Sequence, residues 1–157
     1  MAILDEETAD GVPVARGGEA GDLGPLPSFP GYLFRQGQIK VFTGLHAILA
    51  PDGIRTPVFG VMILLKYNPG IRPSEVAAAL GLKRANFVPL LDELRNRGLA
   101  KAEARSDDRR SRAITLTDAG RALIERLEAA AREYERGINA KIDPENAGLL
   151  AAMVARL

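Results

Sequence analysis

The fold is decided by residues 79–117, ALGLKRANFVPLLDELRNRGLAKAEARSDDRRSRAITLT, in which the spacing of the apolar residues changes partway along. Over residues 83–98 the apolar side chains recur every three or four positions, which predicts an amphipathic helix. This stripe consists of Phe87, Leu90, Leu91 and Leu94. Gly98 then predicts the end of the helix, where the basic residues Arg95 and Arg97 favour the helix dipole.

After Gly98 the apolar residues alternate, which predicts β-strands over residues 99–104 and 112–117. Between these strands residues 105–111, RSDDRRS, contain no apolar side chain and predict a charged hairpin tip. A helix that leads into a hairpin with a basic tip is typical of a winged helix-turn-helix, in which the helix enters the major groove of DNA. Residues 72–81 fit the first helix of that unit. The predicted fold class is therefore mostly α with a small β-hairpin wing.

Pro89 interrupts the helical pattern. A proline past the first turn removes the hydrogen bond to the Ala85 carbonyl and clashes with it, which typically costs about 3 kcal/mol. Two alternatives remain open at this point. Either the helix begins near Arg84 and kinks at Pro89, or its regular part begins near Pro89 after a looser turn.

Four motifs in this region occur in the order and at the spacing of one protein family. They are Leu80-Gly81, residues 90–99 (LLDELRNRGL), Asp108-Arg109-Arg110 and residues 116–120 (LTDAG). On these motifs, residues 31–157 resemble the multiple-antibiotic-resistance regulator (MarR) family of winged-helix repressors. Lys83 departs from the family pattern, because a Ser or Thr usually caps the recognition helix there.

The resemblance implies a homodimer, in which the first and last helices pack across a two-fold axis. Such a dimer is expected to bind an inverted repeat in double-stranded DNA. The resemblance also implies that Asp108 orients the wing and that Arg110 enters the minor groove. A crevice between the dimerisation helices and the DNA-binding lobe is expected to hold small aromatic or anionic ligands.

The rest of the chain is predicted to be one domain preceded by an arm. Residues 1–27 are rich in Gly, Pro and acidic residues, which indicates a flexible acidic arm. Residues 28–157 are predicted to form a single MarR-like domain. Within it, the winged helix is expected over about 54–117 and the dimerisation helices over about 28–50 and 118–157.

The ends of the outer helices are predicted from their capping residues. Expected N-caps are Ser28, Thr56, Thr117 and Asp143. The helix that begins after Thr117 is expected to run to about Arg136, with Gly137 ending or loosening it, and Glu128 is expected to be mostly solvated.

The net charge of +1 conceals an uneven distribution. Residues 1–28 hold six acidic side chains and one basic side chain, Arg16, whereas residues 83–112 hold nine basic and five acidic side chains. A basic central region is the electrostatic pattern expected of a protein that binds nucleic acid.

Composition excludes several classes of site. Because there is no Cys, disulfides, thiolate metal sites and cysteine redox sensing are excluded. The chain has one His and no Gly-x-Ser-x-Gly, P-loop or dinucleotide motif, so no enzyme, cofactor or metal site is predicted. No apolar run approaches membrane-spanning length and no signal peptide is evident, so a cytoplasmic protein without a membrane partner is expected.

The predicted DNA contacts divide into base contacts and phosphate contacts. Base contacts are expected from Lys83, Arg84 and Asn86, because Lys and Arg suit guanine and Asn suits adenine. Phe87 fits the core stripe better than a thymine contact. Phosphate contacts are expected from Arg95 or Arg97, Lys101, Arg105 and Arg109. For each basic residue taken alone, the alternative is a solvated charge.

The candidate ligand residues lie on two predicted helices, residues 28–49 and 56–67. They are Tyr32, Arg35, Ile39, Phe42, His46, Phe59 and Met62. The alternatives are an intersubunit or capping salt bridge for Arg35, a partly buried and satisfied His46, and core packing for Phe59 and Met62. The run Gly31–Arg35 and the run Phe87–Leu90 resemble regulators of aromatic-acid breakdown, some of which respond to coenzyme A thioesters.

The sequence therefore favours a dimeric transcriptional repressor that is released by a small ligand such as an aromatic acid or an acyl-CoA. The alternative is a winged-helix module that binds another protein without binding DNA. The excess of basic side chains in residues 83–112 argues against that alternative.

Overall fold

The computed structural model describes residues 22–104 and 112–157, so most of the predicted acidic arm and the whole hairpin tip lie outside the described residues. These described residues form six α-helices, two strands and two short 3-10 turns. In chain order the elements are η1 (Leu26–Ser28), α1 (Pro30–Leu49), η2 (Ala50–Asp52), α2 (Thr56–Tyr67), α3 (Pro73–Ala79), α4 (Arg84–Asn96), β1 (Ala100–Ala104), β2 (Arg112–Leu116), α5 (Asp118–Ile142) and α6 (Pro144–Val154). This element order confirms the predicted fold class.

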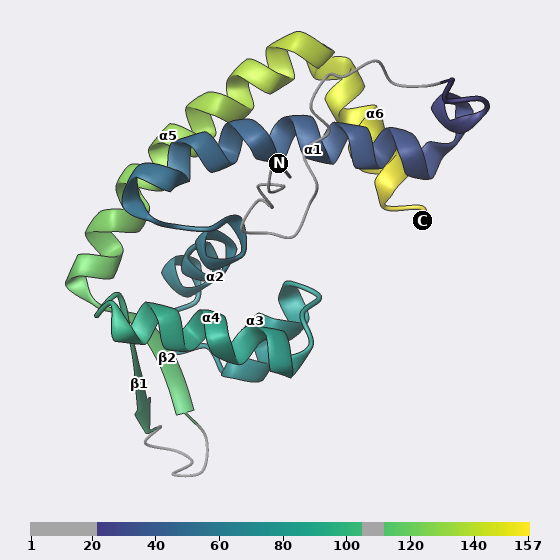
Figure 1. The fold of residues 1–157 in the computed structure, drawn as a ribbon. Coiled ribbons are helices and arrows are strands. Elements are labelled where there is room, and N and C mark those ends of the chain that lie inside the picture. Colours follow the sequence, from purple (N-terminus) through teal and green to yellow (C-terminus); the bar gives the residue numbers. More distant parts are fainter. Residues whose placement is uncertain (1–21, 105–111) are drawn as a thin grey trace, which may run out of the picture.

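Helices α1 and α5 run side by side and form an elongated arm, and α6 folds back at its far end (Figure 1). Helices α3 and α4 and the hairpin form a lobe at the other end, with α2 between lobe and arm. The strands pair antiparallel from Ala100 opposite Leu116 to Ala104 opposite Arg112, and a further bridge joins Ile71 to Ile114. The arrangement is that of a winged helix-turn-helix attached to a helical arm.

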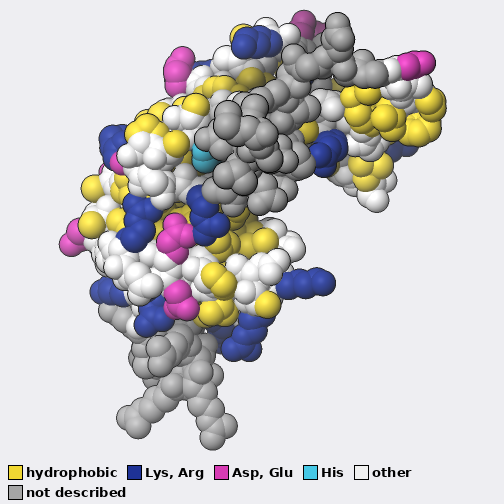
Figure 2. Space-filling model, viewed as in Figure 1, with side chains coloured by type: hydrophobic (Ala, Val, Ile, Leu, Met, Phe, Trp, Pro, Cys, Tyr) yellow, Lys and Arg dark blue, Asp and Glu magenta, His cyan; other side chains and the backbone are white. Residues whose placement is uncertain are grey.

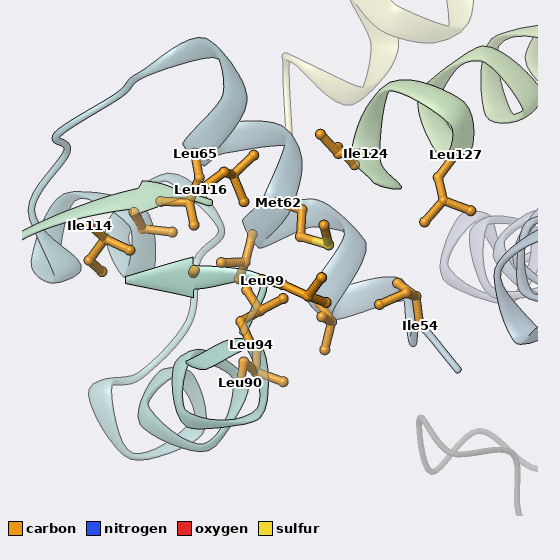
Figure 3. Close-up of a cluster of buried hydrophobic side chains, with 14 of the residues drawn as sticks. Ile54, Met62, Leu65, Leu90, Leu94, Leu99, Ile114, Leu116, Ile124 and Leu127 are labelled. Carbon is orange, nitrogen blue, oxygen red and sulfur yellow. The ribbon is translucent and has the colours of Figure 1, made fainter. Parts of the chain in front are cut away.

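The core is aliphatic, as the low aromatic content predicts, and it joins the lobe to the arm (Figure 3). Side chains from α2, α4, the hairpin and α5 meet in it, among them Met62, Leu94, Ile114 and Ile124. Phe87 is 1% exposed, which confirms the prediction that it belongs to the core. Met62 is fully buried, which fits the core packing that the sequence analysis gives as the alternative to a ligand contact.

Helix α4 begins at Arg84 and continues through Pro89 to Asn96. Of the two alternatives for this helix, a regular part beginning near Pro89 is therefore wrong. The carbonyl of Lys83 accepts hydrogen bonds from the N–H groups of Asn86 and Phe87, at 2.9 and 3.1 Å, so the first turn is properly formed. Pro89 and Ala85 are both exposed, so water can solvate the Ala85 carbonyl that Pro89 leaves without a donor.

Two of the predicted helix caps are wrong. Phe29 occupies the N-cap of α1, and the Ser28 hydroxyl donates to the Pro25 carbonyl at 2.7 Å within the preceding turn. Arg55 occupies the N-cap of α2, and the Thr56 hydroxyl is buried without a hydrogen-bond partner among the described residues. In each helix a proline, Pro30 or Pro57, occupies one of the first two helical positions. A proline there favours a helix start without a side-chain cap.

The caps of the two C-terminal helices are confirmed. The Thr117 side chain accepts from the Gly120 N–H at 3.1 Å, and the Asp143 carboxylate accepts from the Glu145 N–H at the same distance. The expected break at Gly137 is wrong, because α5 continues through it to Ile142. Glycine in an exposed helix costs only about 1 kcal/mol, which the packing of a long helix readily offsets.

The end of α4 and the start of α5 meet at a tight backbone junction. The Thr117 hydroxyl donates to the Gly98 carbonyl at 2.7 Å, and the Thr117 N–H donates to the Leu99 carbonyl at 3.0 Å. Gly98 has a φ of 65°, the left-handed conformation that ends α4 as predicted. A methyl group at Gly120 would overlap the Leu99 carbonyl oxygen, so only glycine fits there.

Glu128 is buried, at 6% exposure, which corrects the prediction that it is solvated. It accepts hydrogen bonds from Lys66 Nζ at 2.8 Å, from the Tyr67 hydroxyl at 2.6 Å and from Arg132 Nε at 2.8 Å. The hydrogen bonds from Lys66 and Tyr67 lower the pKa of Glu128 to about 2. The Glu128 cluster, Lys66–Tyr67–Glu128–Arg132, fastens the end of α2 to α5.

Within the described residues no single helix is long and apolar enough to cross a membrane. The two helical segments Pro30–Asp52 and Thr56–Tyr67 together have the length and apolar composition of a membrane span, but they are bent by 78° relative to each other.

Replacing Gly120 by Ala should lower the free energy of unfolding by about 1–3 kcal/mol, because the added methyl group has no room against the Leu99 carbonyl. Urea denaturation followed by circular dichroism measures the effect. Gly137→Ala is the matched control in the same helix, where an added methyl group meets nothing and should stabilise by about 0.5–1 kcal/mol. Equal effects of the two substitutions would contradict the close junction.

Replacing Glu128 by Gln should lower the free energy of unfolding at pH 7 by about 1–3 kcal/mol, because Lys66 and Arg132 lose their shared carboxylate. The pKa of Glu128 lies below its ordinary value of 4.5, so the carboxylate stabilises the fold above that pH. This stabilisation is lost as the pH falls from 4.5 towards 2. The difference between wild type and Glu128→Gln in urea denaturation should therefore shrink over that window, and a difference independent of pH would disprove the assignment.

Candidate nucleic-acid interface

The first turn of α4 carries the predicted base-reading residues on its exposed side. Lys83 is the N-cap of the helix, and Lys83, Arg84 and Asn86 are all exposed, whereas Phe87 points into the core. The apolar side chain of Val88 is 42% exposed on the same helix. Lys and Arg side chains project from this lobe, whereas apolar side chains gather over α6 at the upper right (Figure 2).

The turn before α4 gives the helix its exposed position. Gly81 has a φ of 64°, which allows the sharp turn between α3 and α4. The Leu82 N–H then donates to the Ala77 carbonyl at 2.8 Å, and Ala77 is itself buried. At the start of α3 the Glu75 carboxylate accepts from the Arg72 N–H at 2.9 Å. These contacts hold α3 beneath α4, so that the first turn of α4 faces outward.

The two basic residues at the end of α4 have different contacts. Arg95 is exposed and pairs with Asp92 at 3.2 Å on the helix surface. Arg97 donates through Nη1 to the Gly53 carbonyl and through Nη2 to the Asp52 carbonyl, each at 2.7 Å. Both terminal nitrogens of Arg97 are thus directed at the turn between α1 and α2. We therefore retain Arg95 as the candidate phosphate contact of this helix end.

The remaining predicted DNA contacts lie on or beyond the hairpin. Lys101 is exposed on β1. Arg105, Asp108, Arg109 and Arg110 lie outside the described residues. The hairpin starts directly after α4, so its paired strands belong to the same lobe as the exposed start of α4 (Figure 1).

The turn between α1 and α2, residues 50–55, forms a charged joint with α4 and α5. The Asp52 carboxylate accepts from Arg126 on α5 through both terminal nitrogens, at 2.9 and 2.6 Å. The hydrogen bond from Arg126 and the nearby positive charges lower the pKa of Asp52. Arg55 donates to Glu93 on α4 at 2.5 Å. These partners are far apart in sequence, so no local pattern could have identified them.

The predicted ligand residues differ in how far they are exposed. Tyr32, Ile39, His46 and Phe59 are half-buried, whereas Arg35 and Phe42 are exposed. Neither the Arg35 nor the His46 side chain has an ion-pair or hydrogen-bond partner within residues 22–104 and 112–157, so no salt bridge among these described residues accounts for Arg35. In the same described residues no group of three or more His, Asp or Glu side chains is arranged to hold a metal ion.

No family model matches the chain. Among solved structures, it is similar to the transcriptional repressor CouR bound to a 23-mer DNA duplex, at 35% identity and a TM-score of 0.78, covering 85% of this chain and 94% of that one. CouR bound to p-coumaroyl-CoA matches at 33% identity and a TM-score of 0.77, covering 87% and 96%.

Two further relatives carry informative names. A putative transcriptional regulatory protein for the hcr operon of Thauera aromatica is 26% identical over 145 residues, which are 92% of this chain and 83% of that protein. A MarR-family transcriptional regulator from Rhodococcus sp. RHA1 is 26% identical with a TM-score of 0.70, covering 79% and 88%. All of these relatives are named as regulators, and none as an enzyme. The exposed first turn of α4, the hairpin and the helical arm agree with these similarities. The chain therefore belongs to the MarR family of DNA-binding, winged-helix transcriptional regulators.

Proposed function

We propose that the chain acts as a dimeric repressor that binds an inverted repeat in double-stranded DNA and is released by an acyl-CoA. One observation carries the proposal. The exposed Lys83, Arg84 and Asn86 begin the recognition helix of a chain whose sequence is 35% identical to that of a repressor solved on DNA. A regulator of this kind works on the chromosome, so we propose a cytoplasmic location.

The proposed base contacts come from the exposed first turn of α4. Lys83 and Arg84 would donate to guanine and Asn86 would pair with adenine in the major groove. Val88, 42% exposed on the same helix, would contact a thymine methyl group. Arg95, Lys101, Arg105 and Arg109 are the proposed phosphate contacts, with Arg110 in the minor groove and Asp108 orienting the wing.

The proposed dimer rests on apolar surface at the free end of the arm. Large apolar side chains of α1 and α6 are between 38% and 55% exposed there, and Leu157 at the end of the chain is 90% exposed. They are Leu33, Phe34, Leu149, Leu150, Met153 and Val154. A contiguous apolar patch of this kind indicates a protein interface, and a second copy of the chain would cover it across a two-fold axis. The two recognition helices would then reach successive major grooves.

The proposed effector is the coenzyme A thioester of an aromatic acid. CouR was solved with p-coumaroyl-CoA. Its sequence is 33% identical to that of this chain, and the match covers 87% of this chain. On this chain, the half-buried Tyr32 and His46 and the exposed Phe42 offer aromatic contacts, and Arg35 on the same face would hold an anionic group by charge-assisted hydrogen bonds. Ligand binding would favour a dimer whose recognition helices no longer match the operator.

Replacing Arg84 by Ala should weaken operator binding by about 1–3 kcal/mol and relax the preference for one base position, because a bidentate guanine contact is lost. Fluorescence anisotropy on a duplex selected by the wild-type protein from a random pool measures both effects. Arg136→Ala is the matched control, since Arg136 is exposed on α5 and pairs there with Glu133.

Two outcomes would contradict the DNA-binding proposal. Wild-type protein that binds no duplex in dilute salt would favour the alternative of a protein-interaction module. Arg84→Ala protein with unchanged affinity and base preference would remove α4 from the base contacts.

Adding p-coumaroyl-CoA at about 100 times its dissociation constant should raise the free energy of unfolding by about 2.7 kcal/mol and release the bound duplex. Differential scanning fluorimetry and anisotropy measure the two effects, with coenzyme A and p-coumaric acid as separate ligands. Arg35→Ala should reduce the thermal shift, whereas Lys40→Ala, exposed on the same helix but off the candidate face, should not. A shift of equal size for both variants would contradict the assigned site.

A further inference from the structure

We propose that Arg97 and Asp52 are positioning residues, which set the orientation of the recognition helix α4 relative to the α1–α5 arm. This inference rests on the proposed function, because it assigns the structural link through which the arm controls DNA binding. The sequence position of Arg97 predicts a phosphate contact, whereas we assign it a positioning role inside the protein.

The first half of the joint connects α4 to the turn between α1 and α2. The two terminal nitrogens of Arg97 each donate to a carbonyl, that of Gly53 and that of Asp52, and both distances are 2.7 Å. A planar guanidinium group that donates to two adjacent carbonyls fixes direction as well as distance. The end of α4 is therefore held at one angle to this turn. Lysine carries the same charge but cannot reproduce the two parallel hydrogen bonds.

The second half of the joint connects the same turn to α5. The Asp52 carboxylate accepts both terminal nitrogens of Arg126, at 2.9 and 2.6 Å. Asp52 thus contacts α4 through its backbone carbonyl and α5 through its side chain. A parallel ion pair, Arg55 with Glu93 at 2.5 Å, joins the start of α2 to α4. Besides the junction at Thr117, this turn is therefore a second place where the arm and the recognition helix are connected by directional polar contacts.

The joint also continues the helix that carries the proposed effector residues. The Ala50 N–H donates to the carbonyl of His46, so the last turn of α1 leads without a break into the turn that holds Asp52. A ligand that displaces the end of α1 would displace the two carbonyls to which Arg97 donates. The end of α4 would move with them, and the span between the two recognition helices of a dimer would change.

Directional contacts are needed here because the core does not supply them. Leu90 and Leu94 hold α4 against α2 by apolar contact, which is non-directional and tolerates small rotations. The side chain of Arg97 is 34% exposed and that of Arg126 is 62% exposed, so neither contributes much to the free energy of unfolding. Loss of the joint should therefore change DNA recognition more than stability.

The test compares Arg97→Lys with Arg136→Lys, both of which keep the positive charge. Arg136 is the matched control because it is exposed on α5 and pairs there with Glu133. The wild-type protein first selects an operator from a random pool, and duplexes are then made with one base pair added or removed between the half-sites. Arg97→Lys should bind the selected operator roughly tenfold more weakly and discriminate less between the spacings, because α4 is held less rigidly. Its salt dependence and urea denaturation should match those of the wild type. Arg136→Lys should keep wild-type affinity and spacing preference.

Each outcome has a separate meaning. If Arg97→Lys keeps the affinity and the spacing preference while Arg97→Gln reduces the salt slope by about one unit, Arg97 is a phosphate contact and the inference is overturned. If the wild-type protein selects no duplex, the proposed function fails and the inference falls with it. Arg126→Gln tests the other half of the joint, where wild-type spacing preference would likewise overturn the inference.

Discussion

The winged helix depends on one backbone junction, where the end of α4, the start of β1 and the start of α5 meet. Thr117 donates to the carbonyls of Gly98 and Leu99 through its hydroxyl and its N–H. Gly120 lies so close to the Leu99 carbonyl that no larger residue fits. Two of the motifs that carry the family resemblance are thus the two sides of a single contact, although the hairpin separates them in the sequence. The same contact orients the arm relative to the recognition helix.

The parts of the fold that the sequence predicts well are those controlled by neighbouring residues. The change of period at Gly98 separates a helix from a hairpin because each backbone conformation presents its side chains at its own spacing. Gly98 is predicted to end a helix and adopts a positive φ, and Thr117 and Asp143 cap helices as expected. The exposed first turn of α4 was also predictable, since its polar residues lie off the apolar stripe.

Contacts between residues that are distant in the sequence could not be predicted from local patterns. Glu128 has the spacing of a solvated residue on α5, and only the approach of Lys66 and Tyr67 from α2 makes its burial favourable. Arg97 has the charge and place of a phosphate contact, yet two carbonyls of a distant turn accept its hydrogen bonds. Neither partner set leaves a local signal, because an Asp in a turn and a Lys at a helix end are ordinary features of any chain.

The two polar connections between lobe and arm differ in burial, and this difference suits them to different tasks. The Glu128 cluster places a buried carboxylate among three donors, so opening it would leave a charge without partners and would cost several kcal/mol. The joint at Asp52 consists of partly exposed ion pairs, which solvent screens, so each contributes little to the free energy of unfolding. The free energy needed to open the joint is therefore small enough for a bound effector to supply. A ligand can therefore rearrange the joint at Asp52 while the Glu128 cluster keeps the lobe attached to the arm.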